Sequence, residues 1–134
     1  MIAAISSWHD CHERARQEIE NRLSRKQRMI VAGPTLIEAY SVLTRFPSPH
    51  RIAPVDARNL LESNFLRGVK VVALSATDYG VLLHGSPDID ISGGQTYDAV
   101  IAACARKAGV HALLTFNEKH FAPFAGDDLE IIVP

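Results

Sequence analysis

Two acidic side chains and one amide stand where a catalytic site could form. They are Glu38 in "PTLIEAYSVLTRF", Asp98 in "TYDAVIAACARKAG" and Asn117 in "LLTFNEKHF". Two carboxylates about 5 Å apart repel each other by roughly 3 kcal/mol at an effective dielectric constant of 20, so a cation between them favours their meeting. Oxygen ligands from Asp, Glu and Asn suit Mg²⁺ or Mn²⁺. Such an ion can polarise a phosphate and activate water.

Each of these residues also has a purely structural interpretation. Thr96 is a predicted N-cap, so Asp98 falls in the first turn of a helix, where the helix dipole stabilises a carboxylate by about 0.3–1 kcal/mol. Thr35 and Glu38 have the spacing of a capping box, in which Glu38 accepts from the backbone N–H of Thr35. Asn117 is a residue type that shapes turns. The residues alone leave both interpretations open.

Short apolar strands alternate with helices along the chain, which predicts an α/β fold. The predicted strands cover 29–33, 69–74, 111–115 and 129–133; the predicted helices cover 9–25, 34–46, 55–68, 75–86 and 96–109; 87–95 is a loop and 116–121 a polar turn. We expect one three-layer domain over residues 1–134, with a parallel sheet between helices on both faces. Sites in such sheets form at the carboxyl ends of the strands, where Glu38, in the first turn of its helix, should meet Asp98 and Asn117.

Composition excludes several classes of protein. With 47% hydrophobic residues among 134, the chain is not of the disordered class. No apolar run reaches the roughly 18 residues of a membrane span. Two cysteines, Cys11 and Cys104, form no disulfide framework, so we expect a cytoplasmic protein with Cys104 in the core. The net charge is −1, yet six of the 14 basic residues lie between Arg14 and Arg28. That segment is either the solvated face of a helix or a phosphate-binding patch.

Three motifs in order resemble the PIN-domain nucleases, specifically the VapC-type toxins of bacterial toxin–antitoxin pairs. "TLIEAYSVLTRFP" resembles the family's second motif, "SGGQTYDAVIAACARKAG" the third and "LLTFNEKHFAPF" the fourth, with Thr115 and Asn117 at its polar positions and Phe121 after them. The resemblance implies a metal-dependent endoribonuclease with Glu38 and Asp98 as ligands of Mg²⁺ or Mn²⁺ and Asn117 orienting water. It also implies an RNA substrate, a VapB-like antitoxin that blocks the site, and a homodimer.

One departure from the family pattern affects this expectation. The family opens with an apolar strand that ends in an aspartate, a main metal ligand, whereas this sequence begins "MIAAISSWHDCHERA". Asp10 is no substitute, because it aligns with the start of the next helix. The resemblance therefore implies that the first, central strand is missing, that it belongs between strands 29–33 and 111–115, and that "MIAAI" is its remnant. We expect the chain alone to be unstable, and translation to begin several codons upstream.

Two alternatives to an active ribonuclease follow from the same residues. One is a catalytically inactive PIN-like module that binds only an antitoxin or a sister toxin. The other is a receiver-like regulatory domain. Such a domain needs a phosphoacceptor aspartate at the end of an early strand, and this sequence has none there.

Two predicted helices carry enough apolar side chains to form a dimer surface. These side chains are Leu60, Leu61, Phe65, Val81, Leu82 and Leu83. The same six side chains are equally suited to a core.

Overall fold

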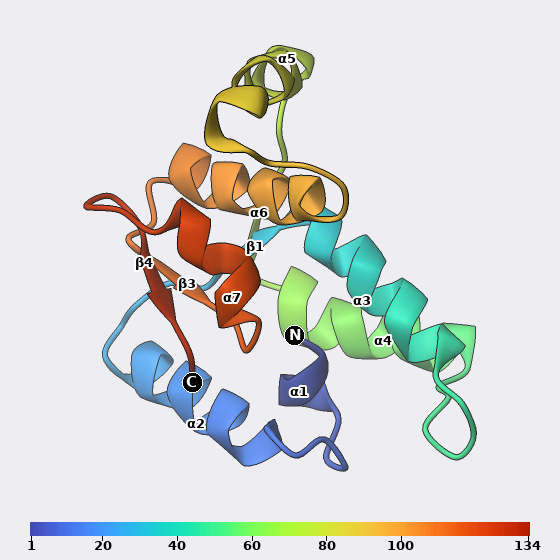
Figure 1. Ribbon diagram of the computed structural model, residues 1–134. Helices are drawn as coiled ribbons and strands as arrows, with labels where there is room; N and C mark the ends of the chain where they lie inside the picture. The colour runs from blue at the N-terminus through green and yellow to red at the C-terminus, as the bar shows by residue number, and fades with distance from the viewer. The chain divides into compact units, whose positions relative to one another are not determined.

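Helices and three-residue strands alternate along the chain, as the sequence predicts (Figure 1). The computed structural model describes all residues from Met1 to Pro134. They divide into two compact units, Met1–Val71 and Val72–Pro134, each of which is described by itself. No helix combines the length and the apolar character that crossing a membrane requires.

The first unit is mostly helical. Its elements are α1 (Ile2–Ile5), α2 (His12–Ser24), β1 (Ile30–Ala32), α3 (Gly33–Arg45) and α4 (Pro54–Leu61), continued by a π-helical turn over Glu62–Leu66, and then β2 (Lys70–Val72), which ends on the first residue of the second unit. Proline begins α3 and α4 because its fixed φ suits the first helical turn, where an N–H is not needed. The core of this unit contains Val31, Ala39, Leu43, Ala57, Leu61 and Phe65.

The second unit is built around the alanine-rich helix α6. Its elements are α5 (Ala76–Gly85), a 3-10 turn (Pro87–Ile89), α6 (Gln95–Ala108), β3 (Ala112–Leu114), α7 (Glu118–Phe121), a second 3-10 turn (Ala122–Phe124) and β4 (Glu130–Ile132). Helix α6 contacts both α5 and α7 (Figure 1). Gly109 ends α6 at φ 68°, a left-handed conformation that glycine adopts without strain. The core contains Ile91, Ala99, Ala102, Phe121, Phe124 and Leu129.

A capping box fixes the start of α5. Ser75 accepts a hydrogen bond from the backbone N–H of Asp78, and the Asp78 carboxylate accepts from the backbone N–H of Ser75 at 2.7 Å. Lys107 of α6 donates to the same carboxylate at 2.6 Å. The Lys107 hydrogen bond, followed by those from Ser75, lowers the pKa of Asp78 from 3.8 to about 2. These contacts join α5 to α6 within the second unit.

The strands form two sheets of two strands, where the sequence predicts one sheet. Strand β1 pairs with β2, and β3 pairs with β4. The pairing of β3 with β4 is parallel, with Leu113 opposite Ile131, which agrees with the predicted parallel arrangement. β1 and β3, the strands expected to flank the missing one, are each paired on one edge only.

The structure corrects the predicted type or starting residue of four elements. The segment "MIAAI" forms the helix α1, and not the remnant of a strand. The predicted helix over 9–25 begins at His12, so Asp10 lies outside it. The polar turn over 116–121 contains the short helix α7. Thr96 is not the N-cap of α6; Gly94 is, because the positive φ of Gly93 (54°) lets the helix begin earlier.

The predicted dimer surface is divided between core and solvent. Leu61 and Phe65 are 5% and 4% exposed and belong to the first core, and Leu82 packs against the second. They are therefore core residues and not a dimer surface, because α4, the π-helical turn and α5 direct Leu61, Phe65 and Leu82 inward. Val81 and Leu83 are 69% and 63% exposed on α5, which has no buried residue. Cys104 is in the core, as predicted, at 1% exposure.

Candidate active site

Asp98 lies in the first turn of α6, as the sequence predicts. Its side chain is 16% exposed, which leaves the carboxylate at the surface but well surrounded. The neighbouring residues Ala99 and Val100 are buried, so α6 turns its apolar face inward and holds Asp98 at the margin of the core. The helix dipole stabilises a carboxylate in this position.

The carboxylate of Asp98 has one partner, His120 of α7. The Nδ1 atom of His120 and the Oδ2 atom of Asp98 are 3.1 Å apart. An ionised carboxylate can only accept hydrogen bonds, so His120 is the donor. The second carboxylate oxygen of Asp98 has no hydrogen-bond partner and can bind a cation. Sequence analysis missed His120, although its position three residues after Asn117 in the fourth motif was a signal that could have identified it.

The loop that carries Asn117 is organised by its neighbours. The Thr115 hydroxyl accepts from the backbone N–H of Asn117 at 3.0 Å. The carbonyl of Asn117 accepts from the backbone N–H groups of His120 and Phe121 at 3.1 and 3.3 Å. The Asn117 side chain forms no cap for α7 and is exposed. Its amide therefore does not shape the turn, and it is available to orient water or substrate in the second unit.

Glu38 lies in the first unit, in the second turn of α3 and not the first. Helix α3 begins at Gly33, one turn before Glu38, because Pro34 favours an early start. The capping box does not form: Thr35 donates its hydroxyl to the carbonyl of Ala32 at 2.6 Å. Glu38 is exposed and makes no hydrogen bond. Burial lowers the pKa of the Met1 amino group, and the nearby Glu38 carboxylate opposes this shift.

The donor atoms in the two units fit a hard cation such as Mg²⁺. Neither unit gathers three His, Cys, Asp or Glu side chains into one cluster, so neither forms an all-protein cage. Mg²⁺ does not need one, because it usually binds through one or two carboxylates and keeps several waters. Within the second unit Asp98 has one oxygen free to ligate such an ion, and within the first unit Glu38 has an exposed carboxylate.

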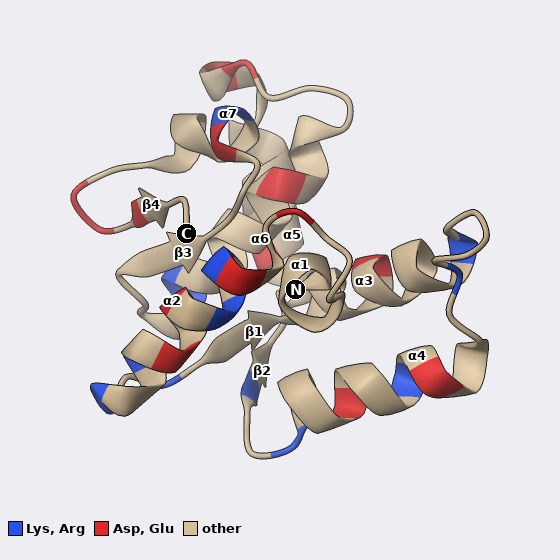
Figure 2. Ribbon diagram, turned by 90° about the horizontal axis from the view of Figure 1, so that it is seen from below, with Lys and Arg blue, Asp and Glu red and all other residues tan.

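Two of the six basic residues between Arg14 and Arg28, both on α2, form ion pairs with acidic side chains. Arg16 pairs with Glu20 at 2.7 Å, and Arg22 with Glu18 at 2.6 Å, both one helical turn apart. Figure 2 shows acidic and basic residues interspersed along this helix. These pairs favour the solvated-face interpretation for α2, since the paired cations are less available to phosphate.

The chain matches the PIN domain over residues 1–126, a range that includes every site residue described above. It is 37% identical over 117 residues to Ribonuclease VapC40 of Mycobacterium tuberculosis, in strains CDC 1551 / Oshkosh and ATCC 25618 / H37Rv, across 84% of this chain and 78% of the relative. It is 39% identical over 75 residues to Ribonuclease VapC27 of the latter strain, across 56% of this chain and 53% of that protein.

Proposed function

The chain belongs to the PIN-domain family, and from this membership we propose that it is a VapC-like toxin that cleaves RNA as a Mg²⁺-dependent endoribonuclease. The observation that carries the proposal is the carboxylate of Asp98, which is held by His120 and keeps one oxygen free at the start of α6. The relatives named ribonucleases are similar to this chain over most of its length, which supports the same activity here.

In this proposal each residue has a defined task. Asp98 and Glu38 would each offer a carboxylate to Mg²⁺ or Mn²⁺. When bound, such an ion would supply positive charge to polarise the scissile phosphate and to activate water. Asn117 orients the attacking water through its exposed amide. Water attacks phosphorus and the 3′ oxygen leaves, so the products carry a 3′-hydroxyl and a 5′-phosphate.

The fold of the active protein is part of the proposal. We propose one PIN-like domain over residues 1–134, three layers thick, with helices on both faces of a parallel sheet and a further strand on the free edge of β3. The support is that β3 pairs in parallel with β4 and has a partner on one edge only. A strand added at that edge would slow amide hydrogen exchange at Ala112 and Leu114, whose N–H groups point away from β4. Rapid exchange at these two residues in the active protein would contradict it.

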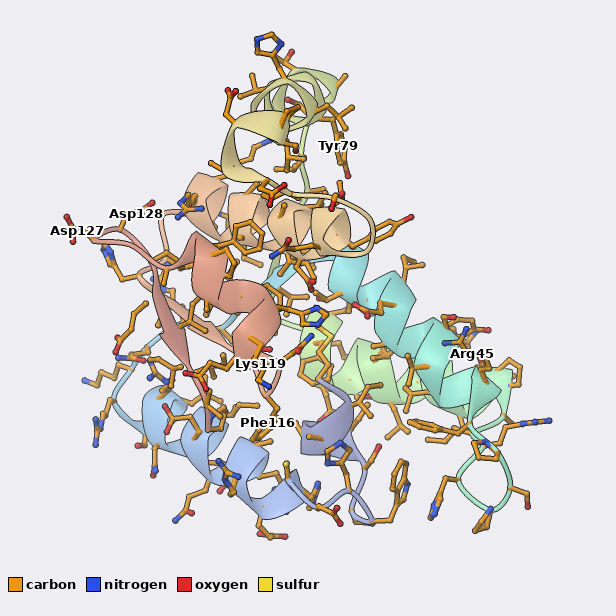
Figure 3. The ribbon with its side chains drawn as sticks, in the orientation of Figure 1. Arg45, Tyr79, Phe116, Lys119, Asp127 and Asp128 are labelled. Carbon is orange, nitrogen blue, oxygen red and sulfur yellow. The ribbon has the colours of Figure 1, made fainter.

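The proposed partners are a VapB-like antitoxin, an RNA substrate and a second copy of the chain in the cytoplasm. The exposed apolar side chains of Val81 and Leu83 on α5 support a two-fold interface, because burial of such a face in a dimer removes it from water. Tyr79 extends from the same helix (Figure 3). Sedimentation of a monomer at high micromolar concentration would refute the dimer.

One observation favours the second candidate, an inactive module that binds only an antitoxin or sister toxin. No three acidic or other ligating side chains cluster in either unit, which fits a chain without a strong metal centre. Cleavage by the purified chain distinguishes the two candidates.

The test uses the full chain, a structured RNA and Mg²⁺. We expect endonucleolytic fragments with 3′-hydroxyl ends, no fragments with EDTA, and none from Asp98→Asn at equal concentration. Lys119→Gln, an exposed change on α7, is the control for loss of activity by handling. Fragments from Asp98→Asn at the wild-type rate would refute the proposal, and absence of any cleavage by the wild-type chain would favour the inactive module.

A further inference from the structure

The contact between His120 and Asp98 joins two segments that are 22 residues apart in sequence. His120 belongs to α7, a single helical turn, and Asp98 to the first turn of α6. This contact needs other interactions to hold it, because the exposed His120 side chain gains little from one hydrogen bond at the surface.

The core supplies these interactions from the residues next in sequence. Phe121 and Ala99 belong to one buried cluster, each 5% exposed. Phe121 follows His120 and Ala99 follows Asp98, so packing of the buried pair brings the polar pair together. The backbone N–H of His120 also donates to the carbonyl of Asn117 at 3.1 Å. His120 is therefore fixed through its backbone and through its neighbour.

The two oxygens of Asp98 are consequently not equivalent. Oδ2 accepts from Nδ1 of His120, and Oδ1 has no hydrogen-bond partner. A carboxylate held through one oxygen cannot rotate freely, and it presents the other oxygen in one direction. Residues that hydrogen-bond to a metal ligand orient it in this way, and their loss typically lowers metal affinity or activity about 10–100-fold.

We propose that His120 is a positioning residue that fixes the carboxylate of Asp98 for binding a divalent cation through its free oxygen. This inference rests on the proposed function, since it takes Asp98 as the metal ligand. His120 touches neither the metal nor the RNA in this role. Its side chain is 58% exposed, so removal of the imidazole should leave the core intact.

Three substitutions separate positioning from a general structural effect. His120→Phe keeps a ring and removes the donor. His120→Asn places an amide nitrogen on the γ-carbon, where Nδ1 stands in histidine, and restores the donor. His120→Gln places its amide one bond further along the side chain. Lys119→Gln, on the same turn, is the matched control (Figure 3).

The measurement is the affinity for Mn²⁺ alone, by titration calorimetry on the full chain, with no RNA present. We expect His120→Phe and His120→Gln to weaken Mn²⁺ binding about 10–100-fold, and His120→Asn and Lys119→Gln to remain within about threefold of wild type. RNA cleavage in Mg²⁺ should follow the same order. Wild-type affinity in His120→Phe, or His120→Asn no better than His120→Phe, would overturn the inference.

Asp98→Asn separates failure of this inference from failure of the proposed function. Loss of Mn²⁺ binding in Asp98→Asn together with wild-type binding in His120→Phe would overturn the positioning role and leave the proposed function intact. Wild-type Mn²⁺ affinity in Asp98→Asn, or no measurable binding by the wild-type chain at millimolar Mn²⁺, would overturn both.

Discussion

Glu38→Gln tests whether Glu38 acts as a ligand or as a helix-stabilising residue. The carboxylate is exposed in the second turn of α3 and makes no hydrogen bond, because Thr35 donates to Ala32 and no capping box forms. The substitution removes only its attraction to the Met1 amino group. No ion pair joins the two groups, and water screens the exposed Glu38 carboxylate, so the loss should be about 0–1 kcal/mol. The melting temperature should therefore fall by no more than about 5 °C.

The expected effect on metal binding is larger. A charge-assisted contact contributes about 1.5–3 kcal/mol. At about 1.36 kcal/mol for each tenfold change, loss of the Glu38 carboxylate corresponds to about a 10–150-fold loss in Mn²⁺ affinity or in the rate of RNA cleavage. The assay pairs thermal melts followed by circular dichroism with Mn²⁺ titration calorimetry and RNA cleavage in Mg²⁺. Glu62→Gln, in the π-helical turn of the same unit, is the matched control.

Two results would refute the reasoning in different ways. A large fall in melting temperature with unchanged Mn²⁺ affinity would mean that Glu38 stabilises the helix and binds no metal. Unchanged stability, unchanged Mn²⁺ affinity and unchanged cleavage would remove Glu38 from the site altogether.

Three further predictions concern the metal, the pH dependence and the two cores. Removal of divalent ions with EDTA should stop RNA cleavage, and added Mg²⁺ or Mn²⁺ should restore it; cleavage that persists in EDTA would contradict a metal mechanism. Lys107 and Ser75 hold the pKa of Asp78 at about 2, below its ordinary 3.8, so this carboxylate stabilises the fold above about pH 4 and the contribution is lost as the pH falls towards 2. Asp78→Asn should therefore flatten the decline in melting temperature between pH 4 and pH 2, and an unchanged slope would speak against it. Leu43→Ala and Leu129→Ala, at 0% and 1% exposure in separate cores, should each lower the free energy of unfolding by about 2–5 kcal/mol in urea titrations.

Strong local signals made much of the second unit predictable. Ser75 and Asp78 form a capping box at the start of a helix, and Gly109 adopts the left-handed conformation that ends α6. The alanine-rich run of α6 before Gly109 leaves little alternative to a helix. Asp98 was therefore placed in the correct turn, although the N-cap is Gly94 and not Thr96.

Weaker or competing local signals explain the errors. Helix α3 begins at Gly33, two residues before Thr35, with Pro34 in its first turn, and this earlier start moved Glu38 out of the first turn. "MIAAI" is a short apolar run, and such a run does not distinguish helix from strand. The contact of His120 with Asp98 joins residues 22 positions apart, and only the packing of α7 on α6 brings them together. The sequence predicts one sheet where the structure has two sheets of two strands. The alternation of helices and strands does not determine which strands pair over long distances in the sequence.

The alanines of α6 limit how this sequence can change during evolution. Ala99 and Ala102 are 5% and 0% exposed within the cluster that seats Phe121. A larger side chain at either position would enter space that the cluster already fills, and overpacking of this kind forces neighbouring elements to shift. A shift of α7 would carry His120 away from Asp98. We therefore expect larger apolar residues at Ala99 or Ala102 to lower activity, although neither position carries a polar side chain of the site. Glycine, alanine and serine are the residues that both positions should tolerate.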